Sequence, residues 1–104
     1  MTSQTDDDQV RLVASRDALD FVRVRGGRLY VWTRTHRCCH GGLTVVESAT
    51  EPPREKGFRR VADDGVEVYV PTALHRLPSE LHLVLRRFPR RHVRAYWNGC
   101  AWVA

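Results

Sequence analysis

The chain has 104 residues, with 17 Lys and Arg side chains against 12 Asp and Glu, and three cysteines. This length suits one small domain and is too short for two. An odd number of cysteines cannot pair off completely, and the adjacent Cys38 and Cys39 could bridge only through a strained ring, which argues against a secreted disulfide scaffold. No stretch reaches the roughly 18–20 apolar residues of a membrane span, so we expect a cytoplasmic protein with no membrane contact.

The acidic and basic side chains are unevenly spread along the chain. Residues 1–9 contain no apolar side chain after Met1 and include three consecutive aspartates, so we expect a disordered acidic tail. Residues 10–104 are expected to fold as a single domain that carries the excess of basic side chains. Such a basic balance fits nucleic acid, acidic protein partners or simple solubility equally well.

A short helix is predicted directly after the tail. Ser15 is a good N-cap residue, and Asp17 places a negative charge in the first helical turn. Apolar residues at helical spacing follow, and the glycine pair at 26–27 can end a helix with positive φ angles. The pattern therefore predicts a helix over residues 15–25.

The rest of the chain is typical of strands and turns. Apolar, β-branched and aromatic runs predict about six strands, within residues 29–33, 43–46, 58–62, 66–70, 81–86 and 93–97. Asp63-Asp64-Gly65 predicts one hairpin turn and Pro89-Arg90-Arg91 another, while residues 72–78 have room for one helical turn. We therefore expect a small, mainly antiparallel, β-rich α+β domain with one N-terminal helix.

The densest chemistry lies between the first two predicted strands. Residues 35–42 are expected to form a glycine-ended loop that holds Cys38 and Cys39 between His36 and His40. Thiolate and imidazole suit iron, iron-sulfur clusters and zinc. Adjacent residues point to opposite faces of a strand, so both cysteines could ligate one metal only in a loop. The spacing is not that of a zinc finger, and the alternative is that one cysteine is a small buried hydrophobe.

The third cysteine, Cys100, lies in a C-terminal segment without charge. Residues 95–104 contain no charged side chain and hold two of the three tryptophans, Trp97 and Trp102. Such a segment is expected either to dock on its own sheet or to bury itself in a partner chain.

The order of these elements resembles the HesB-like, A-type iron-sulfur carrier family over about residues 12–102. The likeness rests on a capped Ala-Leu-x-x-Phe-Val helix, a Gly-Gly that leads into Arg28-Leu29-Tyr30-Val31, a cysteine-glycine loop, the Asp64–Val70 segment, a Leu-x-Leu strand and a closing Asn98-Gly99-Cys100. In that family a loop cysteine and a C-terminal Cys-Gly-Cys hold iron or a cluster, often shared across a dimer. By this resemblance Cys38 or Cys39 takes the loop position and Cys100 one of the terminal positions.

The chain departs from the family pattern at both cysteine sites. Asn98 and Trp102 stand two residues before and after Cys100, so the second terminal cysteine is absent, and the loop has gained a neighbouring one. A cluster normally takes four thiolates where one chain has three, so a homodimer, or His36 or His40, would complete the set. The resemblance implies a non-enzymatic, homodimeric carrier of iron or an iron-sulfur cluster, with zinc as the alternative metal and an apo-protein as recipient.

Two other functions compete with this one. In the first alternative, the chain shares only its fold with the HesB-like family and does not bind metal. It is then a protein-interaction module in which Trp97 and Trp102 form a surface for a dimer or another partner. The second alternative is nucleic-acid binding through the arginine hairpin, which consists of Arg86, Arg87, Arg90, Arg91 and Arg94. Charged residues are the ordinary choice at a hairpin tip and no RNP or KH element accompanies them, so nucleic acid is not the expected partner.

No G-x-S-x-G motif is present, and no catalytic activity is expected.

Overall fold

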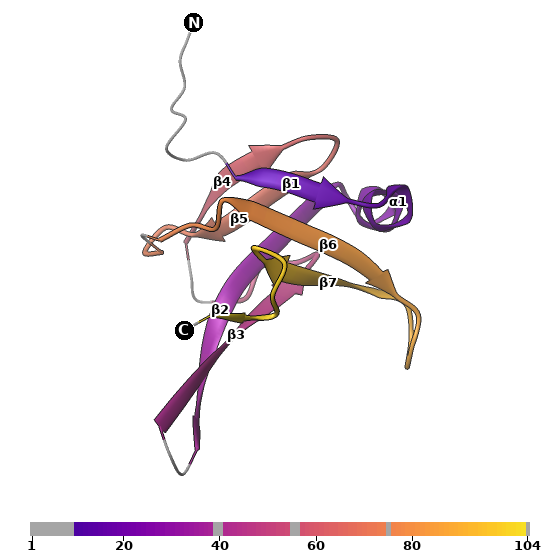
Figure 1. The fold of residues 1–104 in the computed structure, drawn as a ribbon. Helices are drawn as coiled ribbons and strands as arrows, with labels where there is room; N and C mark the ends of the chain where they lie inside the picture. Colours follow the sequence, from indigo (N-terminus) through magenta and orange to yellow (C-terminus); the bar gives the residue numbers. More distant parts are fainter. Residues whose placement is uncertain (1–9, 39–40, 55–56, 75, 104) are drawn as a thin grey trace, which may run out of the picture.

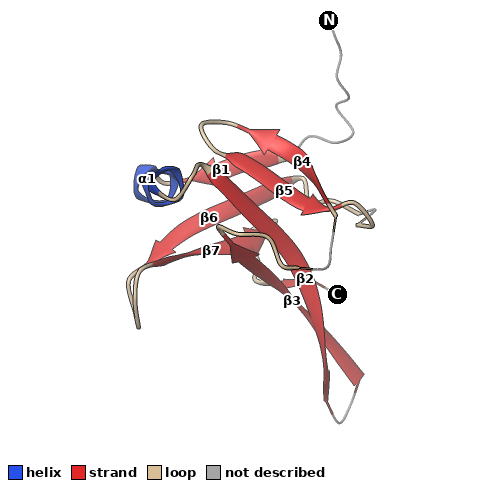
Figure 2. Cartoon of the chain, turned by 180° about the vertical axis from the view of Figure 1, so that it is seen from behind, coloured by secondary structure: helices blue, strands red, loops and turns tan. Residues whose placement is uncertain are grey.

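Two β-sheets pack against each other, with a short helix beside one end of both (Figures 1 and 2). The computed structural model describes residues 10–38, 41–54, 57–74 and 76–103, so the acidic tail expected at residues 1–9 lies outside the described part. The elements in chain order are β1 (Arg11–Ala14), α1 (Arg16–Val24), β2 (Arg28–Cys38), β3 (Gly41–Ala49), β4 (Phe58–Asp63), β5 (Glu67–Pro71), β6 (Glu80–Arg86), β7 (His92–Trp97) and β8 (Trp102–Val103). No helix in these described ranges is long and apolar enough to cross a membrane.

The strand order is β1-β6-β7 in the smaller sheet and β4-β5-β2-β3-β8 in the larger. Two neighbouring pairs, β1 with β6 and β2 with β5, are parallel. The other four pairs are antiparallel. The expectation of a small β-rich α+β domain with one short helix is therefore confirmed, with mixed sheets in which antiparallel pairs are the majority.

Eight strands are present among the described residues, where the sequence predicts about six. β1 has only four residues and pairs with β6, which lies far along the chain, so no local turn signal announces it. β8 has two residues, too few to show a period. The described residues of 72–78 form a turn rather than the expected helical turn, and Leu74 N donates to Pro71 O at 3.0 Å.

The helix forms where its capping signals predict it. Ala18 N donates to the Ser15 hydroxyl at 3.2 Å, which satisfies an amide at the start of α1. At the other end Gly27 N donates to Val22 O at 2.9 Å, and Gly26 and Gly27 have φ angles of 115° and 78°. Positive φ is readily available only to glycine, so this pair turns the chain out of the helix and into β2.

Replacing Ser15 by Ala removes the acceptor for the Ala18 amide. We expect the free energy of unfolding to fall by about 1 kcal/mol, the usual cost of a lost N-cap. Urea denaturation measures this loss, and Arg16→Ala, at the exposed first residue of the helix, is the control that keeps the cap. Equal stabilities of the two variants would show that Ser15 does not stabilise α1.

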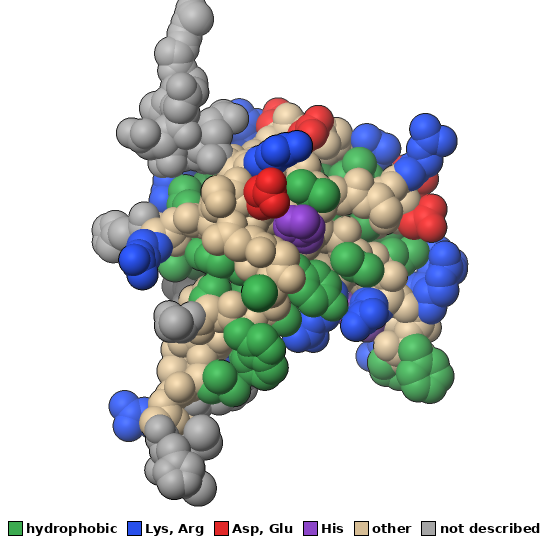
Figure 3. Space-filling view, in the orientation of Figure 1, with side chains coloured by type: hydrophobic (Ala, Val, Ile, Leu, Met, Phe, Trp, Pro, Cys, Tyr) green, Lys and Arg blue, Asp and Glu red, His purple; other side chains and the backbone are tan. Residues whose placement is uncertain are grey.

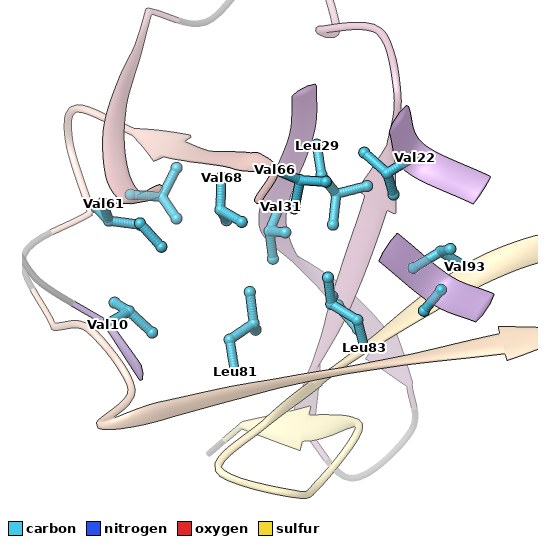
Figure 4. Close-up of a cluster of buried hydrophobic side chains, with 14 of the residues drawn as sticks. Val10, Val22, Leu29, Val31, Val61, Val66, Val68, Leu81, Leu83 and Val93 are labelled. Carbon is cyan, nitrogen blue, oxygen red and sulfur yellow. The ribbon is translucent and has the colours of Figure 1, made fainter. Parts of the chain in front are cut away.

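The core lies between the two sheets and is closed at one end by α1. On β5, Val68 and Val70 are buried together with Val66, as the period of the sequence predicts. Leu81 and Leu83 of β6 face them from the smaller sheet, as Figure 4 shows. The buried side chains form one cluster, so the two sheets and the helix share a single core.

Charged side chains join β5 to its two neighbours in the larger sheet. The Tyr69 hydroxyl donates to Glu67 Oε1 at 2.6 Å, and Glu67 also lies 3.5 Å from Arg28 and 3.8 Å from Arg60. The hydrogen bond from Tyr69 lowers the pKa of Glu67, and the two arginines lower it further. The same hydrogen bond, with partial burial, raises the pKa of Tyr69. Glu67 therefore stays ionised at a lower pH than an isolated glutamate.

Candidate functional site

The cysteine-rich segment stands at the end of a projecting β-hairpin. β2 and β3 pair in continuous register from Tyr30 opposite Ala49 to Cys38 opposite Gly41. β2 pairs with β5 only as far as Tyr30, and β3 pairs with β8 only at Thr44 and Val45. The outer residues, 36–38 and 41–43, therefore extend beyond the rest of the sheet (Figures 1 and 2), and we call them the arm.

The arm replaces most of the loop that the sequence predicts over residues 35–42. β2 continues to Cys38 and β3 begins at Gly41, because the two segments pair residue for residue and the hydroxyls of Thr35 and Thr44 share a hydrogen bond of 3.1 Å. Gly41 has a φ of 120°, which a residue with a side chain rarely adopts. The expectation of a long loop is therefore wrong for the described residues.

The structure describes only part of the predicted ligand set on the arm. The backbone of Cys38 ends β2, and His36 lies on the same strand opposite Leu43. Cys39 and His40 lie outside the described residues. In the parts of the chain that are described, no cluster of three or more His, Cys, Asp or Glu side chains could hold a metal ion.

Cys100 occupies a second, tighter hairpin. Trp97 N donates to Cys100 O at 2.6 Å and Cys100 N donates to Trp97 O at 2.9 Å, so Asn98 and Gly99 form a two-residue turn. Their φ angles of 51° and 85° are those of a type I′ turn, for which Asn-Gly is the preferred sequence. The Asn-Gly dipeptide is a sequence signal for a hairpin turn at this point, and the six predicted strands did not make use of it. The turn leaves the Cys100 thiol free and exposed.

The uncharged C-terminal segment docks on its own sheet. β8 pairs with β3, and Val46 N donates to Ala101 O at 3.1 Å. Val103 packs against the core, and Trp97 is half-buried there. Of the two expectations for this segment, docking on its own sheet is the one that the structure shows.

Within one chain, Cys38 and Cys100 are not brought together. Cys38 lies opposite Gly41, whereas the residue after Cys100 bonds to Val46, five residues further along β3. At the rise of a β-strand this separation is about 17 Å, several times the spacing of two thiolates on one metal.

An apolar strip runs along one face of the larger sheet toward the arm. Val45 lies directly opposite Trp102, and Leu43 is two residues away on the same strand, so the three side chains share a face. Leu43 is 43% exposed and Trp102 is 56% exposed. We call Leu43, Val45 and Trp102 the apolar strip, and Figure 3 shows hydrophobic side chains gathered near β8 and the arm.

The arginine hairpin connects β6 to β7 on the opposite side of the molecule from the arm (Figure 1). Its five arginines are exposed. Arg87 lies 3.6 Å from Asp17, and the Arg94 guanidinium lies 6.0 Å from the centre of the Tyr96 ring. The structure therefore brings these arginines to one end of the smaller sheet, as expected.

The fold is that of a small β-rich domain in which the backbone of Cys38 stands at the outer end of a projecting hairpin. The chain belongs to the CC/Se motif containing family, whose model matches residues 11–92. This span includes Cys38-Cys39, the only adjacent cysteines in the chain, and ends before Cys100.

The other comparisons gave one similar solved structure. It is a crystal structure of Escherichia coli SufA, described as involved in the biosynthesis of iron-sulfur clusters, with 13% identity and a TM-score of 0.42. The match covers 95% of this chain and 100% of that one. No curated protein matches the chain.

Proposed function

We propose that the protein binds iron or an iron-sulfur cluster through Cys38 and Cys39 and passes this metal to a recipient protein. The observation that carries the proposal is the position of Cys38 at the outer end of the arm, beyond the strands that cover the core. Ligands at such a position can reach a second chain, which a carrier requires. The resemblance of the sequence to HesB-like, A-type carriers supports the same function.

The number of thiolates requires two chains. Cys38 and Cys39 give one chain two adjacent cysteines, and a cluster normally takes four thiolates, so two chains supply a complete set. Four thiolates also suit zinc, which is the alternative metal. Cys100 lies about 17 Å along β3 from the arm end of its own chain, so we assign it no ligand role within that chain.

The apolar strip is the surface we propose for contact between the two copies. Its Leu43 belongs to the arm itself, and the large, exposed Trp102 lies next to it on the same face. Arg34 and Glu47 form an ion pair of 3.3 Å on this same face, and such a polar edge is usual around an apolar contact. A contact here would place the two arms side by side.

Anaerobic reconstitution tests the proposal. The full chain is incubated with iron and sulfide, or with zinc, and bound metal and visible absorption are measured for the wild type, Cys38→Ser/Cys39→Ser and Cys100→Ser. We expect the double variant to lose essentially all bound metal, because serine is a far poorer ligand for iron or zinc. We expect Cys100→Ser to keep the metal content and spectrum of the wild type.

Sedimentation of the same samples tests the second copy. We expect the wild type to sediment as a dimer when loaded with metal, and Cys38→Ser/Cys39→Ser to remain a monomer under the same conditions. Circular dichroism checks that all variants fold. A wild type that binds no metal, or a double variant that binds as much as the wild type, would contradict the proposal.

A further inference from the structure

A cavity of about 540 Å³ lies between the end of α1, the end of β3 and the start of β7, well away from the arm. Its floor is apolar and is formed by Phe21, Leu29 and Val93, which are 8%, 1% and 8% exposed. Figure 4 shows Leu29 and Val93 at this end of the core. These core side chains therefore show only a small part of their apolar surface to the cavity.

Cationic and polar side chains line the rest of the cavity. The wall includes Arg25, Arg90, His92 and Thr50, and the described residues that line the cavity include no Asp or Glu. The Arg25 guanidinium lies 3.6 Å from the centre of the Phe21 ring, and its Nη1 donates to Phe21 O at 3.4 Å. This contact positions Arg25 over the apolar floor and leaves its other N–H groups for a ligand.

His92 is held in one orientation. Its Nδ1 lies 2.8 Å from Arg90 O. A carbonyl oxygen only accepts hydrogen bonds, so Nδ1 donates this bond, and in the neutral ring Nε2 is an acceptor. The bond also fixes the ring to the backbone of Arg90, another residue of the wall.

The two carboxylates of the depression that adjoins the cavity, which Arg25 also lines, form ion pairs with other arginines. Asp17 and Asp20 lie in the adjoining depression, but Asp17 is 3.6 Å from Arg87 and Asp20 is 3.3 Å from Arg23. Among the described residues, Arg25 and Arg90 have no carboxylate partner. Figure 3 shows Lys and Arg side chains on this side of the molecule, around α1 and the β6–β7 turn, with acidic side chains beside them near α1.

We propose that this cavity binds a small phosphate ester with an apolar or aromatic body. Arg25 and Arg90 would hold the phosphate, since guanidinium groups match its oxygens in pairs. The Thr50 hydroxyl offers a further donor to the phosphate. The apolar body of the ligand would lie against the accessible edges of Phe21 and Val93. This inference does not depend on the metal function.

The test titrates the full chain with 1-naphthyl phosphate by calorimetry. We expect saturable binding of one ligand per chain, with at least tenfold weaker binding of 1-naphthol and of inorganic phosphate, because each lacks one half of the recognised structure. Arg25→Gln/Arg90→Gln is expected to weaken binding at least tenfold, since each charged hydrogen bond contributes about a factor of ten or more. Arg86→Gln is the control, because Arg86 belongs to the same hairpin and does not line the cavity.

Arg90→Gln alone keeps the proposal testable if the loss of Arg25 disturbs the packing on Phe21, and we expect this single change to weaken binding about tenfold. A single-stranded 12-nucleotide DNA distinguishes the cavity from binding of a strand by the whole arginine hairpin. Absence of naphthyl phosphate binding, equal affinity for 1-naphthol, or an equal effect of Arg86→Gln would overturn the proposal. Binding of the DNA alone, weakened equally by Arg86→Gln and Arg90→Gln, would overturn it in favour of the hairpin.

Discussion

Leu81→Ala is expected to lower the free energy of unfolding by about 2–5 kcal/mol, the range for a buried leucine truncated to alanine. Leu81 is 2% exposed and lies on β6, the middle strand of the smaller sheet. Figure 4 shows its side chain between the sheets, directed toward the valines of the larger one. A natural domain has only about 5–15 kcal/mol of stability, so this single change removes a large part of it.

Val84→Ala is the control for this prediction. Val84 is on the same strand but is 40% exposed and points away from the core, so its truncation leaves no internal cavity. We expect urea denaturation to show a loss of less than about 1 kcal/mol for this variant. Similar losses for the two variants would mean that the face of β6 that carries Leu81 does not form the core.

Asn98→Ala is expected to destabilise the protein by about 2 kcal/mol. Asn98 Oδ1 accepts from Glu80 N at 2.9 Å and from the Ser79 hydroxyl at 3.1 Å, so the side chain ties the β7–β8 turn to the start of β6. Its φ of 51° adds a second cost, because alanine pays about 1–2 kcal/mol in the left-handed region and the two exposed hydrogen bonds contribute about 0.5 kcal/mol each.

Asn98→Gly separates these two contributions. Glycine adopts the positive φ readily but has no side chain, so we expect it to lose only the hydrogen bonds, about 1 kcal/mol. Thermal and urea denaturation of the two variants measure the difference. Neither change should alter the metal content after reconstitution, because the turn lies far from the arm. A loss of metal in Asn98→Ala would instead connect the Cys100 turn to the metal site.

Much of the fold could be predicted from local signals. Ser15 and the glycines at 26–27 mark the ends of α1, and the alternation of Val66, Val68 and Val70 marks the buried face of β5. These signals act over a few residues, so sequence alone contains them. β1 is different: its existence depends on parallel pairing with β6, about 70 residues away, which no local pattern records.

The candidate site was predictable in its chemistry but not in its geometry. Cys38 and its neighbours are conspicuous as ligand types, yet the pairing of Cys38 with Gly41, which turns a loop into an arm, depends on the register of two whole strands. The separation of Cys100 from the arm depends on where β8 docks on β3. The cavity beside Arg25 and His92 is formed by three elements distant in sequence, and only the folded chain brings them together.

The central claim is that the adjacent Cys38 and Cys39 are the metal ligands. X-ray absorption at the iron edge of the reconstituted full-length protein tests it most directly, because sulfur neighbours scatter differently from nitrogen and oxygen. We predict sulfur scatterers around iron in the wild type and in Cys100→Ser, and their loss in Cys38→Ser/Cys39→Ser. An iron environment of oxygen and nitrogen alone in the wild type, or sulfur ligation that disappears only when Cys100 is replaced, would contradict the account.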